Sequence, residues 1–237
     1  GAILIWKFGF IGVFALGFLI HFFDAIFCFI RLRKQASHLT EPIKIKESGR
    51  NYLKTIEVLR KKENYPLIFI SFLVLVLGGF NNAFFVLFLK NFGFSFNQIL
   101  VFNSVLSLVF VPISIWLIRR ISKLNSERNV SLGSQIVGIF SILLGAFAGV
   151  LNFLSIFLIM IGKYVGGLMA GSGRSGLLTT KLKENPEESA AVDTIFAPLA
   201  TAIGALVGGL IILPLGYPLI FIIFGVLIFG AGTIKMK

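Results

Sequence analysis

Long apolar stretches, each about the length of a membrane-spanning helix, alternate with short polar segments along most of this chain. A helix needs about 20 mostly apolar residues to cross the hydrocarbon core of a bilayer. Stretches of this kind cover residues 8–31, 66–90, 97–118, 131–151, 153–177, 189–212 and 216–235. The pattern predicts an all-α polytopic membrane protein with about seven transmembrane helices.

The composition favours the same class. Hydrophobic residues make up 57% of the 237 positions, 27 of them are phenylalanine, and the mean hydropathy is +0.94. A soluble domain of this length would need more polar surface. The single cysteine, Cys28, excludes an internal disulfide and a zinc site built from cysteines, and we expect neither a metal nor a cofactor.

Residues 34–65 form the one long polar segment, which we expect to be a basic linker in the cytoplasm. Its part from Tyr52 to Lys62 places apolar residues at roughly helical spacing between cations, which is typical of an amphipathic helix lying on a membrane. We therefore predict contact with anionic lipid at residues 44–62. The net charge of +12 does not indicate nucleic-acid binding, because no recognition motif of basic and aromatic residues accompanies it.

Positive charge is concentrated in alternate loops. The segments that follow the first, third and fifth apolar stretches carry most of the cations, as does the C-terminus, whereas the other side has only Lys7 and Lys90. By the positive-inside rule, the linker, the loop 119–130, the turn 178–188 and the C-terminus are cytoplasmic. We expect a multi-pass protein of the cell membrane with its last residue inside.

Small residues recur four positions apart in the helices on either side of the turn near Pro186. This spacing lets helix backbones approach closely in lipid. The pairs are Gly162 with Gly166, Gly167 with Gly171, and Gly204 with Gly208. Asn185 followed by Pro186 and two glutamates predicts the start of a helix, with proline at its first position.

The order of these features resembles the major facilitator superfamily of secondary transporters, entered at its sixth helix. The basic linker is similar to the connector between the two six-helix halves of that family, and Leu89–Ile99 is similar to the turn between its seventh and eighth helices. Residues 112–128 occupy the place of the family's helix-loop-helix signature. They keep Leu117, Arg120 and a basic residue, Lys123. They depart from the signature at three positions: Ile115 and Ser122 stand where glycine is usual, and Arg119 stands where an acidic residue is usual. Asn185–Glu188, followed by Gly204, Gly208 and Gly209, is similar to the region of the tenth and eleventh helices.

The resemblance implies three parts. Residues 1–33 would be the last helix of an N-terminal half, residues 34–65 the cytoplasmic linker, and residues 66–237 a six-helix C-terminal half. Folds of this kind build each half from two three-helix repeats of inverted topology. The partner would be a missing N-terminal half or, in a homodimer, a second copy of the chain.

Lys163 is the strongest candidate for a residue on a substrate path. It lies about ten residues into its helix, hence about 15 Å deep and near the midplane, where this architecture places substrates. The alternatives are a structural pair with an acid and a helix face turned elsewhere. Asn81, Asn82 and Asn103 are further candidates for the path, or else they form hydrogen bonds between helices.

Two further groups of polar residues lie within the predicted helices. Arg174 and Asp193 are near the ends of helices joined by one short turn, so a structural or gating ion pair is expected, with separate snorkelling of each side chain or a direct substrate role as the alternatives. His21 and Asp24 share a helix face with Cys28. They form either a proton or ion relay, or a face that packs against other helices or snorkels toward the membrane surface. Phe224, in the last apolar stretch, is expected to face lipid.

Enzymatic motifs for metal ligation, nucleophilic attack or nucleotide hydrolysis are absent from the sequence, so we expect no enzyme. The resemblance implies alternating-access transport of a small molecule or ion, driven by a gradient, as part of a larger two-half transporter. Two alternatives remain. A seven-helix receptor or retinal protein would carry its Schiff-base lysine in the last helix, and absorption of visible light would reveal it. A membrane scaffold that does not transport is the other.

Overall fold

The computed structural model describes residues 12, 15–16, 18–27, 30, 65–121, 123–181 and 186–234, with only the backbone described for residue 181 and for residues 186–196. All regular elements in these ranges are helices. Of the predicted first span, residues 18–27 form a helix whose side chains are exposed. Residues 34–64, with the lipid-binding segment predicted at 44–62, lie outside the described residues.

Five of the described helices are long and apolar enough to cross a membrane, by length and composition. They are α3 (Tyr65–Asn91), α4 (Phe96–Ile121), α5 (Ser126–Ala146), α6 (Phe153–Lys181) and α7 (Pro186–Gly232), and the short 3-10 helix η2 (Ala148–Val150) follows α5. The predicted all-α class and the transmembrane helices are therefore supported, whereas the count of seven is not established. The predicted helix start at Pro186 is observed.

Helix α7 consists of two arms that meet at a sharp break. Gly216 has non-helical dihedral angles, φ 69° and ψ 165°, between a first arm of residues 186–215 and a second arm of residues 217–232. Glycine tolerates a positive φ without steric cost, and Pro218 supplies no backbone N–H. The predicted interruption between the last two apolar stretches is thus a turn at a single residue.

Helix α5 begins and ends five residues earlier than the apolar stretch predicted at 131–151. It runs from Ser126 to Ala146, and the side-chain oxygen of Asn125 accepts a hydrogen bond of 3.4 Å from the N–H of Glu127. The carboxylate of Glu127 in the first turn also suits the positive end of the helix dipole. The prediction was wrong because hydropathy alone excludes the polar first turn.

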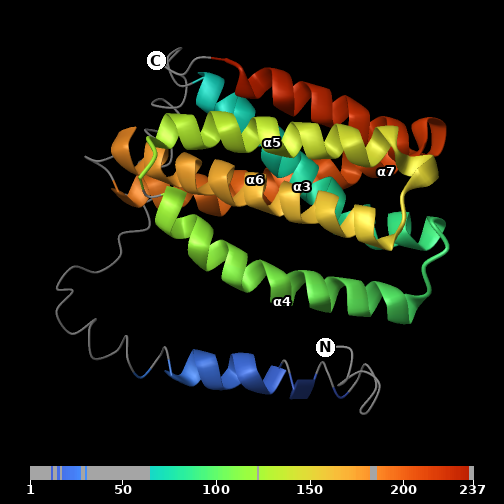
Figure 1. Ribbon diagram of the computed structural model, residues 1–237. Helices are drawn as coiled ribbons and strands as arrows, with labels where there is room; N and C mark the ends of the chain where they lie inside the picture. The colour runs from blue at the N-terminus through green and yellow to red at the C-terminus, as the bar shows by residue number, and fades with distance from the viewer. Residues whose placement is uncertain are drawn as a thin grey trace.

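The long helices run in alternating directions between two ends of the bundle. Figure 1 shows the α4–α5 and α6–α7 connections and the C-terminus at one end, and the α3–α4 turn, the α5–α6 connection and the break in α7 at the other. Arg119 and Arg120 in the last turn of α4 belong to the first end, together with Lys123, whereas Lys90 closes α3 at the second. This separation agrees with the alternation of charged loops along the sequence.

A labelling experiment tests this alternation in the membrane. With Cys28 replaced by serine, cysteine at exposed Lys123 and cysteine at exposed Asn97 should react with a membrane-impermeant maleimide from opposite faces of sealed vesicles. The positive-inside rule predicts Lys123→Cys on the cytoplasmic face. Reaction of both variants from the same face would contradict the arrangement of α4.

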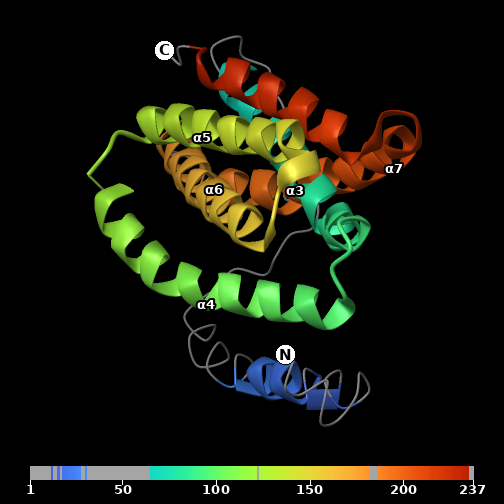
Figure 2. The same cartoon turned by 45° about the vertical axis from the view of Figure 1, so that its right-hand side comes forward.

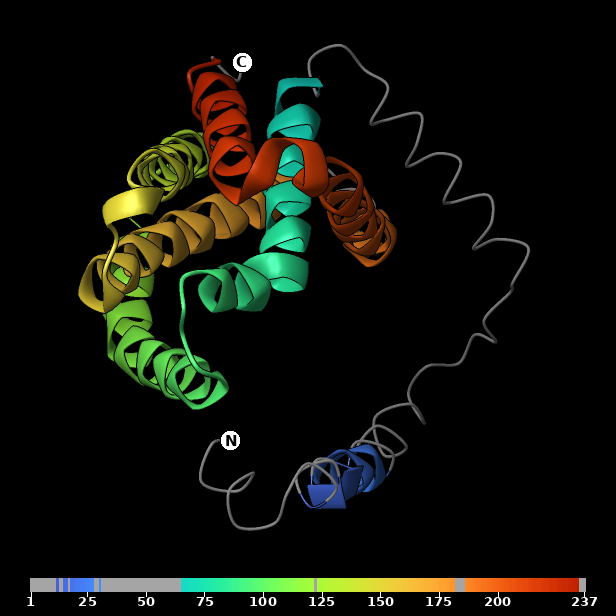
Figure 3. The same ribbon diagram turned by 90° about the vertical axis from the view of Figure 1, so that its right-hand side faces the viewer.

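Close helix contacts occur where glycines face a neighbouring backbone. A Cβ atom added to Gly166 of α6 would lie 2.8 Å from the carbonyl oxygen of Gly133 in α5, and one added to Gly138 of α5 would lie 2.7 Å from the carbonyl oxygen of Gly225 in the second arm of α7. Gly204 of the first arm lies against Val76 of α3. These contacts place α5 between α6 and the second arm, with α4 on the outside of the bundle (Figures 2 and 3).

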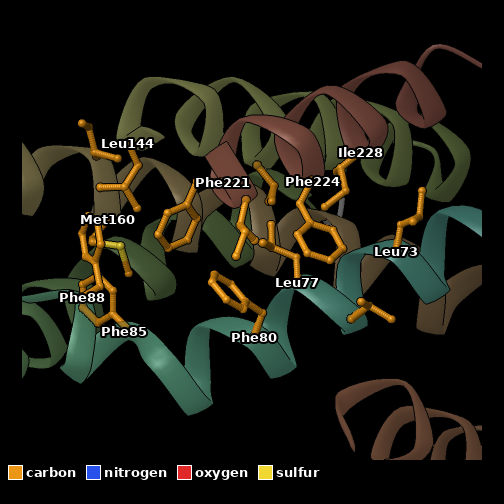
Figure 4. Close-up of a cluster of buried hydrophobic side chains, with 14 of the residues drawn as sticks. Leu73, Leu77, Phe80, Phe85, Phe88, Leu144, Met160, Phe221, Phe224 and Ile228 are labelled. Atoms are coloured by element: carbon orange, nitrogen blue, oxygen red, sulfur yellow. The ribbon is translucent and has the colours of Figure 1, made fainter. Parts of the chain in front are cut away.

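A cluster of phenylalanine rings holds α3 against the second arm of α7 (Figure 4). The ring centroid of Phe221 lies 5.2 Å from that of Phe80 and 5.2 Å from that of Phe88, both in edge-to-face geometry, which is favourable for aromatic pairs. Phe224 belongs to the same cluster and is only 7% exposed. The prediction that Phe224 faces lipid was therefore wrong, because the last apolar stretch has a buried face.

Candidate functional site

A cavity with several polar residues in its wall lies between α3 and α6, closed by single residues of α4 and α5. Its volume is about 330 Å³, at the lower end of the range typical of small-molecule sites. It is lined by Val74, Leu77, Gly78, Asn81, Asn82, Phe110, Val137, Met160, Lys163, Tyr164, Gly167 and Leu168. The wall is apolar except for a lysine, a tyrosine and two asparagines.

Lys163 is the charged residue of this wall. Its side chain is 6% exposed, and its Nζ donates a hydrogen bond of 3.1 Å to Oδ1 of Asn81. The same Nζ lies 4.8 Å from the ring centroid of Phe221, within cation–π distance. Within the part of the chain whose side chains are described, no carboxylate forms a salt bridge with Lys163. The amide oxygen and the aromatic face therefore stabilise the ammonium group.

The helical period explains how α6 brings its polar residues to one side. Residues spaced three or four apart lie on the same face of a helix, and eleven residues make about three full turns. One face of α6 therefore carries positions 163, 167, 170 and 174. All four line cavities between α6 and α3. Gly167 has no heavy atom within 4 Å of an added Cβ, nor has Gly171. The prediction of a close helix contact at this pair was wrong, because these glycines face open space.

The structure places only some of the other predicted path residues at this cavity. Asn82, which is exposed, lines the cavity beside Asn81. Tyr164, the neighbour of Lys163 in the chain, also lines it; this side chain is 45% exposed and its ring centroid lies 5.3 Å from that of Phe110. Asn103 is half-buried on α4 and is not part of this wall. The structure thus brings Lys163, Asn81 and Asn82 to one cavity and leaves Asn103 outside it.

A second cavity, of about 110 Å³, continues along the same two helices toward the end of α6. The two cavities share Val74 and Gly167. Arg174, half-buried, lines the second cavity together with Ser71 of α3 and Ser134 of α5. Neither serine was a predicted site residue, although Ser71 precedes Asn82 by eleven residues and hence shares its face of α3.

Asp193, His21 and Asp24 are not among the residues that line the two cavities. The side chain of Asp193 lies outside the described residues, so its pairing with Arg174 stays a prediction. His21 and Asp24 are exposed on the helix of residues 18–27. Among the described residues, no group of three or more histidine, cysteine or carboxylate side chains is placed to hold a metal ion.

Comparisons with family models, with curated proteins and with solved structures give no match.

Proposed function

We propose that this chain forms part of a secondary active transporter of the major facilitator type, which moves a small solute by alternating access. The observation that carries the proposal is Lys163, buried at the wall of a cavity inside a bundle of apolar helices. An ionisable residue in the membrane is costly and commonly marks a substrate or ion pathway. A scaffold without transport activity would not need such a residue beside an open cavity.

The helix contacts support an inverted repeat. If α3, α4 and α5 correspond in order to α6 and the two arms of α7, the two sets start from opposite ends of the bundle, as Figure 1 shows. Under this correspondence, the contact between α4 and α6 is equivalent to the contact between the first arm of α7 and α3. In the first of these contacts, the ring centroids of Phe102 and Phe157 lie 5.8 Å apart. The contact of α5 with α6 corresponds to that of the second arm with α3.

In such repeats the substrate site lies near the bilayer midplane, at the interface of the two repeats. Here α3 and α6 supply ten of the twelve residues that line the larger cavity. The complete transporter would add a second half, either a separate N-terminal half or a second copy, and would lie in the cell membrane with the C-terminus of this chain in the cytoplasm. The cation at the wall favours solutes that carry negative charge or hydrogen-bond acceptors.

Transport into vesicles tests the proposal. Membrane vesicles that contain the complete transporter, this chain together with its second half, should accumulate members of a set of radiolabelled small carboxylic acids and inorganic anions when a proton gradient is imposed, and a protonophore should abolish the accumulation. Vesicles that contain the Lys163→Gln variant serve as the matched control. Accumulation no greater than in vesicles without the protein, for every member of the set, would contradict the proposal.

A further inference from the structure

We propose that the larger cavity binds a small monocarboxylate that carries an aromatic ring. The carboxylate would lie at the amide groups of Asn81 and Asn82, and the ring would lie against Phe110 and Tyr164. Treating this cavity as the substrate site rests on the proposed function, and the class of solute named here goes beyond it. Binding to the cavity can still be measured apart from transport.

The amide of Asn81 has an orientation that its partner fixes. Its Oδ1 accepts a hydrogen bond of 3.1 Å from Nζ of Lys163, and because an ammonium group has donors only, the NH2 group must occupy the other side of the amide. Asn81 is half-buried and lines the cavity. Its Nδ2 has no hydrogen-bond partner among the described residues and is not one of their inaccessible unpaired polar atoms, so it is open to a ligand.

The charge of Lys163 acts on the cavity through this amide. The lysine side chain is 6% exposed, and its Nζ lies between Oδ1 of Asn81 and the ring of Phe221, which is not part of the cavity wall. We therefore assign the contact with a ligand to the amide and only the electric field to the ammonium group. An amide that accepts a hydrogen bond from a cation is polarised and becomes a stronger donor on its other side.

Asn82 adds a second amide at the same place. This side chain is exposed, lines the cavity and forms no hydrogen bond within the described part of the chain. Two neighbouring amides can donate to the two oxygens of one carboxylate. The wall contains one cation and no acidic residue, so a ligand with a single negative charge balances it.

Two aromatic rings border the other part of the wall. Phe110 of α4 is half-buried and Tyr164 of α6 is 45% exposed, and their ring centroids lie 5.3 Å apart with 43° between the ring planes. A third ring can pack against both with the offset or edge-on geometry that aromatic groups prefer. The volume of about 330 Å³ lies at the lower end of the range for small-molecule sites, which suits a solute with a single ring.

Radiolabelled benzoate serves as the probe. The full chain is purified in an uncharged detergent and dialysed to equilibrium against benzoate, with micelles without protein as the blank, and we expect saturable binding. Cyclohexanecarboxylate keeps the charge but lacks the aromatic ring, and should compete about fivefold less well. Benzamide keeps the ring but lacks the charge, and should compete about tenfold less well.

Variants of the wall test the two contacts separately. Asn82→Ala should lower the benzoate affinity by about tenfold, because it removes a hydrogen bond to a charged ligand. Tyr164→Leu should lower the affinity for benzoate by about fivefold and leave that for cyclohexanecarboxylate unchanged. The matched controls are Asn97→Ala and Phe69→Leu, at exposed positions that do not line the cavity. Both should bind benzoate as the unmodified protein does, and size-exclusion chromatography verifies that each variant is intact.

The outcomes separate this site from the proposed function. No saturable binding of benzoate, equal affinities for benzoate, cyclohexanecarboxylate and benzamide, or a double variant Asn82→Ala/Tyr164→Leu that binds as Asn97→Ala does, would overturn the proposal. Uptake of other anions by the complete transporter without any binding of benzoate would also overturn it, while leaving the proposed function in place. Benzoate binding with the expected effects of the variants, but without uptake of any solute, would support this site and contradict the proposed function.

Discussion

Replacement of Lys163 by glutamine is expected to leave the amount of folded protein unchanged and to lower transport per folded molecule by about tenfold or more. The glutamine amide can still donate a hydrogen bond toward Asn81, and a neutral group is cheaper to bury than an ammonium group. Because no carboxylate among the described side chains pairs with Lys163, the change strands no acid there. What is lost is the positive charge at the cavity wall.

The control for this prediction lies on the same helix. Leu158 of α6 is 57% exposed, and Leu158→Ala should change neither abundance nor transport. Uptake in vesicles, divided by the amount of folded protein, measures both variants. If Lys163→Gln transports as well as the unmodified protein, Lys163 is not part of the path. If abundance falls first and the remaining protein transports normally, Lys163 has a structural role instead.

A single methyl group at Gly166 is expected to lower the free energy of unfolding by about 2 kcal/mol. Its added Cβ would lie 2.8 Å from the carbonyl oxygen of Gly133 and 2.8 Å from the backbone nitrogen of Val137. Backbone atoms of α5 cannot move aside without separating the two helices. Unfolding by denaturing detergent, monitored by circular dichroism, measures the effect.

The adjacent residue supplies the control. Gly167→Ala adds the same methyl group one position along α6, where no heavy atom lies within 4 Å, and should raise stability slightly because alanine favours a helix. Equal destabilisation by Gly166→Ala and Gly167→Ala would mean that α5 and α6 do not pack as described.

The sequence predicts the apolar helices and several of their ends. The α3–α4 turn between Asn91 and Phe96, the start of α6 at Phe153 and the start of α7 at Pro186 follow from apolar length and local turn chemistry. These features depend on residues close together in the chain. The depth of Lys163 in α6 follows from the same information.

The rest depends on how each helix is rotated about its axis and on which helix lies beside it. Gly166 and Gly167 are identical neighbours, yet one meets α5 and the other a cavity. Asn81 is 82 positions from Lys163, and nothing local distinguishes it from Asn103 as the partner. Phe224 belongs to an apolar stretch whose buried and lipid-facing sides have similar residues, so hydropathy did not separate them.

Two-sided accessibility of the larger cavity tests alternating access most directly, because it needs no known substrate. In the Cys28→Ser background, cysteine at Asn82, which is exposed and lines the cavity, should react with a membrane-impermeant maleimide from either face of the membrane, in right-side-out and in inverted vesicles. Cysteine at Asn97 should react from one face only, and cysteine at lipid-exposed Leu158 from neither. Reaction of Asn82→Cys from one face alone would contradict the account.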